Sequence, residues 1–268
     1  MERNTTRYYP TDLTEAQWQL LLALLPARKW RSGGPGRPPC DLRQVLNGIF
    51  SLLKTGCQWR MGPREVGKWN TSYRYFTGGR ETGVWATLME ALRQRERRRQ
   101  GRQAEPCAGS VDSQSIKTAT QATEVGFDGG KQVKGRKRHL LVDTLGLLIA
   151  VVVSAANTED RVGFLLLLTR YFVGGVRRLR KLWVDGGYQA EWLTQWVRDL
   201  KHTHKIDLEV TSHAGPGFQV VPWRWVVERT FAWLLNDRRH SRDYERLTAN
   251  SEAMIQLSMI RLLLKRLA

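Results

Sequence analysis

Three carboxylates stand in segments of the sequence where a charge is costly. Asp112 lies in the stretch Ser-Val-Asp-Ser-Gln-Ser, and Asp185 ends an apolar run just before two glycines. Glu228 lies in the strongly apolar segment Arg-Trp-Val-Val-Glu-Arg. A carboxylate is expensive to remove from water unless a positive group holds it. That group could be an arginine or a divalent metal ion. Metal suits phosphodiester chemistry, in which two ions about 3.5–4 Å apart clamp the attacking and leaving oxygens.

Each acid also has an interpretation in which its role is structural and not catalytic. Asp112 could be a turn aspartate, and Asp185 could cap the next helix, although that helix is expected to begin near residues 189–190. Glu228 follows Arg224 by one helical turn, so the two could pair on a solvent-exposed face. Because apolar side chains surround this helix, we instead expect a largely buried pairing of Glu228 with Arg224 or with a metal.

Composition points to a polyanionic partner. The chain has 268 residues, is 41% hydrophobic and carries 43 Lys and Arg against 25 Asp and Glu, a net charge of +18. Such charge attracts nucleic acid or a membrane surface. No apolar run approaches the roughly 18 residues that span a bilayer, and the N-terminus lacks a signal-peptide pattern. These features predict a cytoplasmic protein. Cys40, Cys57 and Cys107 form no CxxC pair, which argues against a zinc site or a disulfide framework.

Basic clusters flank the three acids along the sequence. They include Lys134, Arg136, Lys137 and Arg138 before an expected hairpin, Arg177, Arg178, Arg180 and Lys181 before Asp185, and Arg238, Arg239 and Arg242 after Glu228. Acidic residues surrounded by basic clusters suit a nuclease-type active site, in which the basic residues attract phosphates and the acids bind metal ions. The alternative is solubilising charge, which normally mixes both signs more evenly.

The first hundred residues are predicted to be helical. Thr14 begins a capping box, Asp41 caps a second helix, and Gly56 ends that helix. A short third helix is expected to close at Gly78-Gly79, before a fourth. The third carries Arg74 and an aromatic back, so these helices could form a helix-turn-helix or an ordinary bundle. We predict a helical DNA-binding domain over residues 1–100.

The remainder of the chain alternates strands and helices after a linker at residues 101–108. Strands are expected at 111–112, 137–143, 147–154, 182–185 and 206–210; helices are expected from a cap at 157–160 to 172, after residue 189, from Pro222 to Leu235, and from a cap at Asn250-Ser251 to the end. The 137–154 pair is a predicted hairpin. This order predicts an α/β domain over residues 109–268 with a mixed sheet flanked by helices. Asp112 and Asp185 would meet at one end of that sheet if their strands are neighbours.

Several long motifs resemble bacterial insertion-sequence transposases of the group around insertion sequence five. The motifs lie at residues 9–18 (YPTDLTEAQW), 36–43, 53–61 (LKTGCQWRM), 111–117 (VDSQSIK), 134–146, 185–188 (DGGY) and 224–233 (RWVVERTFAW). The resemblance covers nearly the whole chain. It implies a ribonuclease H-like catalytic domain with a DDE triad of Asp112, Asp185 and Glu228 that binds magnesium or manganese, as two ions.

The resemblance also implies DNA transposition. The substrates would be double-stranded transposon ends and target DNA, bound by a homodimer at the nucleoid. Two positions depart from the pattern. Val221 stands where relatives can carry tyrosine, and Leu235 stands where a lysine is expected, although Arg238 or Arg239 could substitute. Alternative functions are a catalytically inactive DNA-binding derivative and a nuclease without strand transfer.

Overall fold

The computed structural model describes residues 9–26, 40–173, 178–204, 206–211 and 223–268. Within α6, defined below, it leaves several side chains undescribed. The first four residues of the motif at 36–43, as well as Arg177, Val221 and Pro222, lie outside the described residues.

The described residues of the N-terminal third of the chain are organised mainly as helices. They are α1 (Glu15–Leu22), α2 (Leu42–Thr55), α3 (Trp69–Glu81) and α4 (Val84–Arg99), with the short 3-10 turns η1 (Trp59–Met61) and η2 (Arg64–Val66) between α2 and α3. The predicted capping box at Thr14 is confirmed, because its side chain accepts from the Gln17 backbone. Asp41 caps α2, and Gly56 ends it with a left-handed φ of 72°.

The third helix differs from its prediction. It does not close at Gly78-Gly79 but runs through both glycines to Glu81. Gly79 serves packing instead, because a Cβ at this position would lie 2.4 Å from the Trp85 ring. Residues 56–68 separate α2 from α3, so these two helices do not form a helix-turn-helix with a short turn.

One mixed sheet forms the second part of the protein. Its strands are β1 (Ala108–Lys117), β2 (Gly126–Asp128), β3 (Val133–Asp143), β4 (Leu148–Ala155), β5 (Lys181–Asp185) and β6 (Asp207–Thr211). The order is β2-β3-β1-β5-β6, and β4 also pairs with β3. β1 and β5 are parallel neighbours. The β3–β4 hairpin is confirmed, and Asp143 stabilises its turn by accepting from the backbone of Leu145 and Leu147, each at 2.9 Å. The short strand β2 was not predicted.

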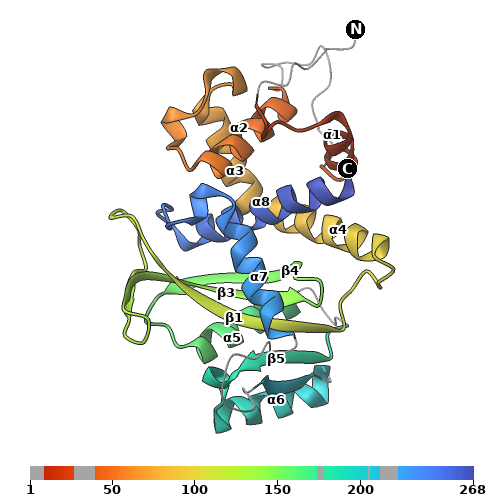
Figure 1. Ribbon diagram of the computed structural model, residues 1–268, viewed down its shortest axis with the longest axis vertical. Helices are drawn as coiled ribbons and strands as arrows, with labels where there is room; N and C mark the ends of the chain where they lie inside the picture. Colours follow the sequence, from red (N-terminus) through yellow and green to blue (C-terminus); the bar gives the residue numbers. More distant parts are fainter. Residues whose placement is uncertain (1–8, 27–39, 174–177, 205, 212–222) are drawn as a thin grey trace.

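Helices cover both faces of this sheet (Figure 1). α5 (Asp160–Phe172) and α6 (Glu191–His204) pack on one face. α7 (Arg224–Leu235) and α8 (Thr248–Leu267) lie on the other. The N-terminal helices share one hydrophobic core with α7, α8 and the inner side chains of β3 and β4. α7 is therefore held between the sheet and the helical layer.

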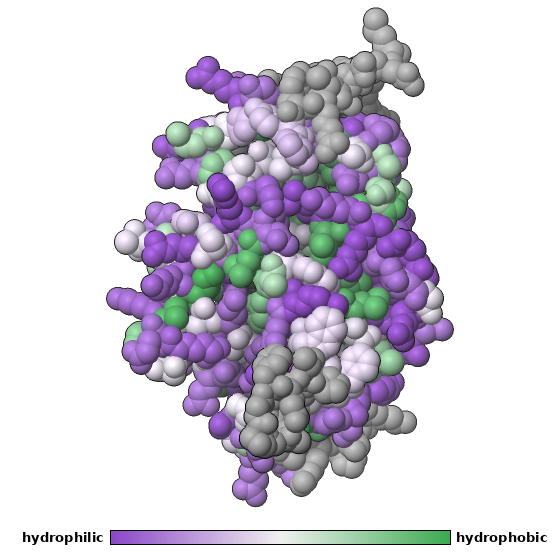
Figure 2. All heavy atoms as spheres, in the orientation of Figure 1, coloured by the Kyte–Doolittle hydropathy of each residue, from purple (hydrophilic) through white to green (hydrophobic). Residues whose placement is uncertain are grey.

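The start of α8 corrects a further expectation. The helix begins at Thr248, so Asn250 and Ser251 do not cap it. Both side chains are buried and bind other segments: Asn250 accepts from Arg80, and Ser251 donates to Asp243 at 2.7 Å. No helix in the described ranges is long and apolar enough to cross a membrane. The face seen in Figure 2 is mostly hydrophilic, with hydrophobic residues gathered in a band across its middle.

Candidate active site

Asp112 and Asp185 come together at the centre of the sheet. In the parallel β1–β5 ladder, Ser110 is the partner of Trp183, and each aspartate follows its member of this pair by two residues. Both aspartates line one small hollow, together with Arg224 of α7 and Thr211 of β6. Strand pairing therefore brings together two acids that are far apart in the sequence.

The environment of Asp112 disfavours its charge. The pKa of its carboxyl is raised from the usual 3.8 to about 6, mainly by burial and also by the neighbouring charge of Asp185. The Ser113 backbone N–H, which donates to the carboxylate at 2.7 Å, and the cations Lys131 and Arg224 act in the opposite direction. Burial prevails, so metal-free Asp112 holds its proton more tightly than an ordinary aspartate.

Asp185 has a capping role that the sequence analysis judged weak. Its carboxylate accepts from the Gly187 backbone at 3.0 Å and so caps η3 (Gly186–Tyr188), a 3-10 turn before α6. The helix α6 itself starts later, at Glu191. Its other carboxylate oxygen lies 3.7 Å from an Arg224 nitrogen. The cap fixes the carboxylate while leaving it facing the cation.

Arg224 links the second acid to the third. Its guanidinium lies 3.5 Å from Glu228 and 3.7 Å from Asp185. The expectation of a largely buried Glu228 is wrong, because the side chain is 56% exposed. The helix buries Val227 and Phe231 but leaves Trp225 and Leu235 exposed, so it keeps a solvent face despite its apolar composition.

Contacts at its start and in its middle fix the position of α7. At its start, Ser110 of β1 donates to the Trp223 carbonyl at 2.7 Å, and the Trp223 ring stacks on Trp183 with centroids 5.1 Å apart. Trp223 adopts a left-handed φ of 72°, a strained conformation for a bulky residue. In its middle, Thr230 donates to the Gly146 carbonyl of the hairpin turn at 2.8 Å. These bonds orient α7 so that the side that carries Arg224 and Glu228 faces β1 and β5.

Four of the predicted DNA-contacting cations face the protein interior. Arg136, Lys137, Arg138 and Arg239 are at most 7% exposed. Arg136, for example, donates to the carbonyls of Glu245 and Arg246. The three β3 residues are internal because this strand is flanked by strands on both edges and is buried from Gly135 on. Arg239 lies after α7 and is held by Glu245 and the Cys57 carbonyl. Lys134 and Arg238 are exposed, and their contacts with DNA stay predictions.

A second polar network, which the sequence analysis missed, supports Asp112 from the other face of β1. Ser113 donates to Asp160 at 2.6 Å, and Asp160 pairs with buried Lys137 at 3.1 Å. Lys131 donates to the Ser113 carbonyl at 3.2 Å. Tyr188 is buried nearby, and burial raises the pKa of its hydroxyl. One feature of the sequence could have indicated this network. Asp112 and Ser113 are neighbours on a strand, so their side chains point to opposite faces of the sheet.

Two of the three acids have side chains that suit a divalent cation where they stand. Asp112 and Asp185 supply the hard oxygen donors that Mg²⁺ or Mn²⁺ prefers. The Arg224 guanidinium already occupies the neighbourhood with positive charge, which shows that the site attracts a cation. In the described part of the chain, no three acidic, histidine or cysteine side chains form a ready cage. Glu228, paired with Arg224, therefore has to turn toward the aspartates to complete a three-carboxylate site.

The raised pKa of Asp112 predicts a pH-dependent gain in stability on Asp112→Asn. Above pH 6, the metal-free wild type bears the cost of an ionised, partly buried carboxylate, at most about 3 kcal/mol for the shift from 3.8 to about 6. Below about pH 4 the carboxyl is protonated in both the folded and the unfolded state, so the cost disappears. We expect the variant to exceed wild type in unfolding free energy at pH 8 but not at pH 4.

Urea denaturation in the presence of a chelator measures this difference. Asp199→Asn, at an exposed position on α6, is the control and should show no comparable pH-dependent gain. An equal difference at both pH values would contradict the assigned burial.

Comparison with known families accounts for most of the chain. Residues 103–263 match the family model "Transposase DDE domain". Residues 13–89 match a second model, "Putative transposase of IS4/5 family". The first match covers more than half of the 268 residues. The sheet with flanking helices is the ribonuclease H-like fold of such domains, as predicted.

Two relatives from Burkholderia cepacia agree with these matches. One, "Insertion element IS402 uncharacterized 16.2 kDa protein", is 36% identical over 112 residues, which are 41% of this chain and 75% of the relative. The other, "Putative transposase for insertion sequence element IS402", is 32% identical over 129 residues, or 46% of this chain. The chain spans only 60% of that second relative's length.

Proposed function

Because the chain belongs to the transposase DDE domain family, we propose that it binds the terminal inverted repeats of its own insertion sequence, cleaves the DNA ends by metal-dependent hydrolysis and joins the 3′ ends to target DNA. The observation that carries the proposal is the hollow in which Asp112 and Asp185 lie side by side beneath Arg224 and the glutamate paired with it. Such acids within a chain of net charge +18 fit a phosphodiester substrate.

Asp112, Asp185 and Glu228 would hold the magnesium or manganese ions, two in number. Bound metal supplies Lewis-acid stabilisation of the phosphate and a lowered pKa for the attacking water. The protein's own contribution is positional. Strand pairing fixes the two aspartates, and the Gly187 N–H orients Asp185. The helix α7, which packs on the face of β1 that carries Asp112, keeps this carboxyl largely out of bulk water, which strengthens its interaction with a cation.

We further propose that Arg224 changes partner when substrate binds. In the structure, its guanidinium neutralises Asp185 and Glu228. With metal held by these carboxylates, the Arg224 guanidinium would be free to contact a phosphate oxygen of the DNA. Arginine suits this role because its planar fork holds two oxygens at once. Trp223 and Trp225, both more than 40% exposed, flank Arg224 and present ring surface to an unpaired base beside the cut.

Arg224→Lys should therefore slow cleavage more than it weakens binding. Lysine keeps the charge but loses the fork, and one phosphate contact among many is a small share of DNA affinity. Single-turnover cleavage and a binding titration on the same end-containing duplex measure the two effects. Cleavage at the wild-type rate would restrict Arg224 to a structural ion pair.

The proposed activity is tested with a duplex that carries the inverted repeat flanking the gene, incubated with Mg²⁺ or Mn²⁺. We expect metal-dependent cuts at the repeat boundary, followed by joining of the 3′ end to a second DNA. Binding without cleavage would identify an inactive DNA-binding derivative. Cleavage without joining would identify a nuclease. Either result would overturn the proposed transposition.

A further inference from the structure

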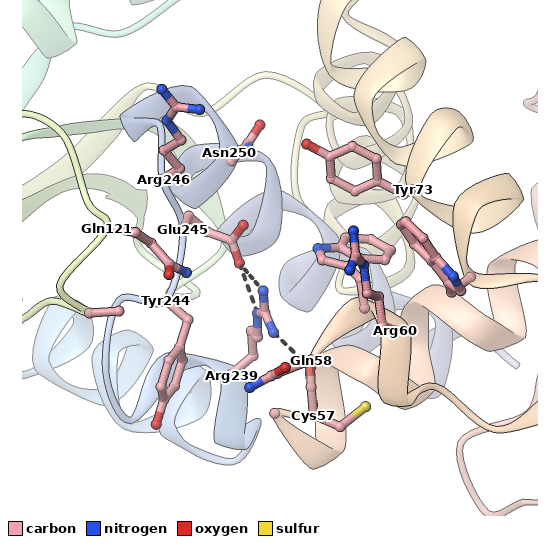
Figure 3. Close-up of a pocket in the computed structure, with 14 residues that line it drawn as sticks. Cys57, Gln58, Arg60, Tyr73, Gln121, Arg239, Tyr244, Glu245, Arg246 and Asn250 are labelled. Carbon is pink, nitrogen blue, oxygen red and sulfur yellow. Dashed lines mark hydrogen bonds and ion pairs between the residues drawn. The ribbon is translucent and has the colours of Figure 1, made fainter.

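A cavity of about 700 Å³ lies between the helical layer and the segment that follows α7, away from the three acids (Figure 3). One side is formed by residues 56–60 and the start of α3, and the other by residues 239–250 and the connection after β1. Its volume is in the range of cavities that enclose organic ligands. Its described lining includes none of the three acids and, from the predicted basic clusters, Arg239.

An aromatic wall lines the side formed by the helical layer. Trp69 and Tyr73 of α3 are 39% and 37% exposed. Tyr73 is held from behind, because Trp59 packs edge-on against it with centroids 5.1 Å apart and also contacts buried Phe76. The Arg60 guanidinium lies 5.3 Å from the centroid of the Trp69 ring. The ring surfaces are therefore pre-positioned, which lowers the entropy lost when a flat ligand stacks on them.

The opposite wall supplies charge and hydrogen-bonding groups. Arg239 binds the Glu245 carboxylate at 2.6 and 2.8 Å and the Cys57 carbonyl at 2.8 Å, so it joins the two walls (Figure 3). Glu245, which is thus neutralised, is the single acid among the described residues that line the cavity. Arg246 and Arg60 are exposed, and neither has a carboxylate partner in the described portion of the protein. The cavity as a whole therefore favours an anion.

Flat rings, exposed arginines and the amides of Gln58 and Gln121 match the chemistry of a nucleotide. Bases stack on aromatic rings, arginines hold phosphates, and amides bind base edges. A fully stacked duplex presents its phosphates but not the faces of its bases, so exposed rings inside a cavity favour an unpaired nucleotide. We propose that this cavity binds an unpaired nucleotide of single-stranded or locally opened DNA.

The location connects the cavity to the proposed cleavage site, and in this respect the inference rests on the proposed function. The rim residue Ala119 follows Asp112 by seven positions along β1 and its extension, at most about 23 Å at 3.3 Å per residue. Asp112 also points to the α7 side of the sheet, where the cavity lies. One DNA molecule could reach both places, with the unpaired nucleotide up to about seven base steps of 3.4 Å from the cut phosphate.

The test uses a fluorescein-labelled oligothymidylate and a blunt duplex of equal length, titrated with the full-length protein in low salt. Trp69→Ala should weaken oligothymidylate binding by about 5- to 140-fold, the equivalent of 1–3 kcal/mol for one stacked base. Duplex binding should change much less. Trp69→Phe, which keeps a ring, should retain most of the affinity. Arg60→Ala should weaken the binding of both DNAs by removing a phosphate contact.

Trp192→Ala is the matched control, because Trp192 is 46% exposed on α6 in the opposite layer. Thermal melting should be the same for all variants, since the substituted side chains are exposed. Wild-type oligothymidylate affinity in Trp69→Ala would overturn the proposal, and so would equal losses for single strand and duplex. Asp112→Asn separates the two proposals, because oligothymidylate binding can be titrated in this variant without DNA cleavage. A defect of the cavity appears in that titration, whereas failure of the proposed function appears only in the cleavage assay.

Discussion

Asp112→Asn, Asp185→Asn and Glu228→Gln should each abolish DNA cleavage while DNA binding persists. Each change removes one negative charge and keeps the shape of the side chain, so metal affinity falls and the fold is preserved. Loss of an outer partner of a metal site typically costs about 10–100-fold, and loss of a direct ligand should cost more. The measurement is single-turnover cleavage of end-containing duplex across a Mg²⁺ titration, beside a binding titration.

Two controls sharpen this expectation. Asp199→Asn removes a charge from exposed α6 and should cut normally. Excess Mn²⁺ should partly restore the Asp185→Asn variant if the defect is weakened metal binding, because Mn²⁺ binds a given ligand set more tightly than Mg²⁺. Normal cleavage by any one of the three variants would remove that residue from the proposed triad.

DNA affinity should fall steeply with salt. Neutralising six to ten phosphates releases counterions, which corresponds to a loss of about 10³–10⁵ in affinity between 50 and 200 mM salt. The chain has the charge for such contacts even though Arg136, Lys137, Arg138 and Arg239 are internal. Fluorescence anisotropy of a labelled duplex over a salt series gives the slope directly.

Single substitutions identify the cations that face the DNA. Lys134→Gln and Arg238→Gln alter exposed side chains and should each lower the salt slope by about one if the residue contacts a phosphate. Arg161→Gln, on α5, serves as a matched loss of one charge outside the proposed DNA-facing side. A flat salt response of the wild type would show that the positive charge does not face DNA.

Short-range patterns in the sequence were sufficient to predict the elements that depend on local interactions. Thr14 and Asp41 cap their helices as predicted, because a short polar side chain binds the free N–H groups of the next turn. The hairpin over residues 133–155 follows from two runs rich in valine, leucine and isoleucine around a turn that Asp143 stabilises. Asn250 failed as a cap because a buried contact with Arg80 competed with the local preference.

The sequence by itself determined which residues are candidates for chemistry. Asp112, Asp185 and Glu228 stood out because carboxylates in apolar segments need a cationic partner. Only the tertiary structure decided how they are placed. The parallel pairing of β1 with β5 puts the two aspartates together, whereas Glu228 reaches them through Arg224 and is exposed.

Burial of the basic run and formation of the cavity were likewise decided by long-range packing. The sequence predicts a surface patch at Arg136 and Arg138, but β3 is a central strand that is buried from Gly135 on. The cavity joins Trp69 to Arg246 across a long stretch of sequence. A linear pattern records which face of its own helix or strand a residue occupies, whereas what covers that face depends on strand order and helix packing.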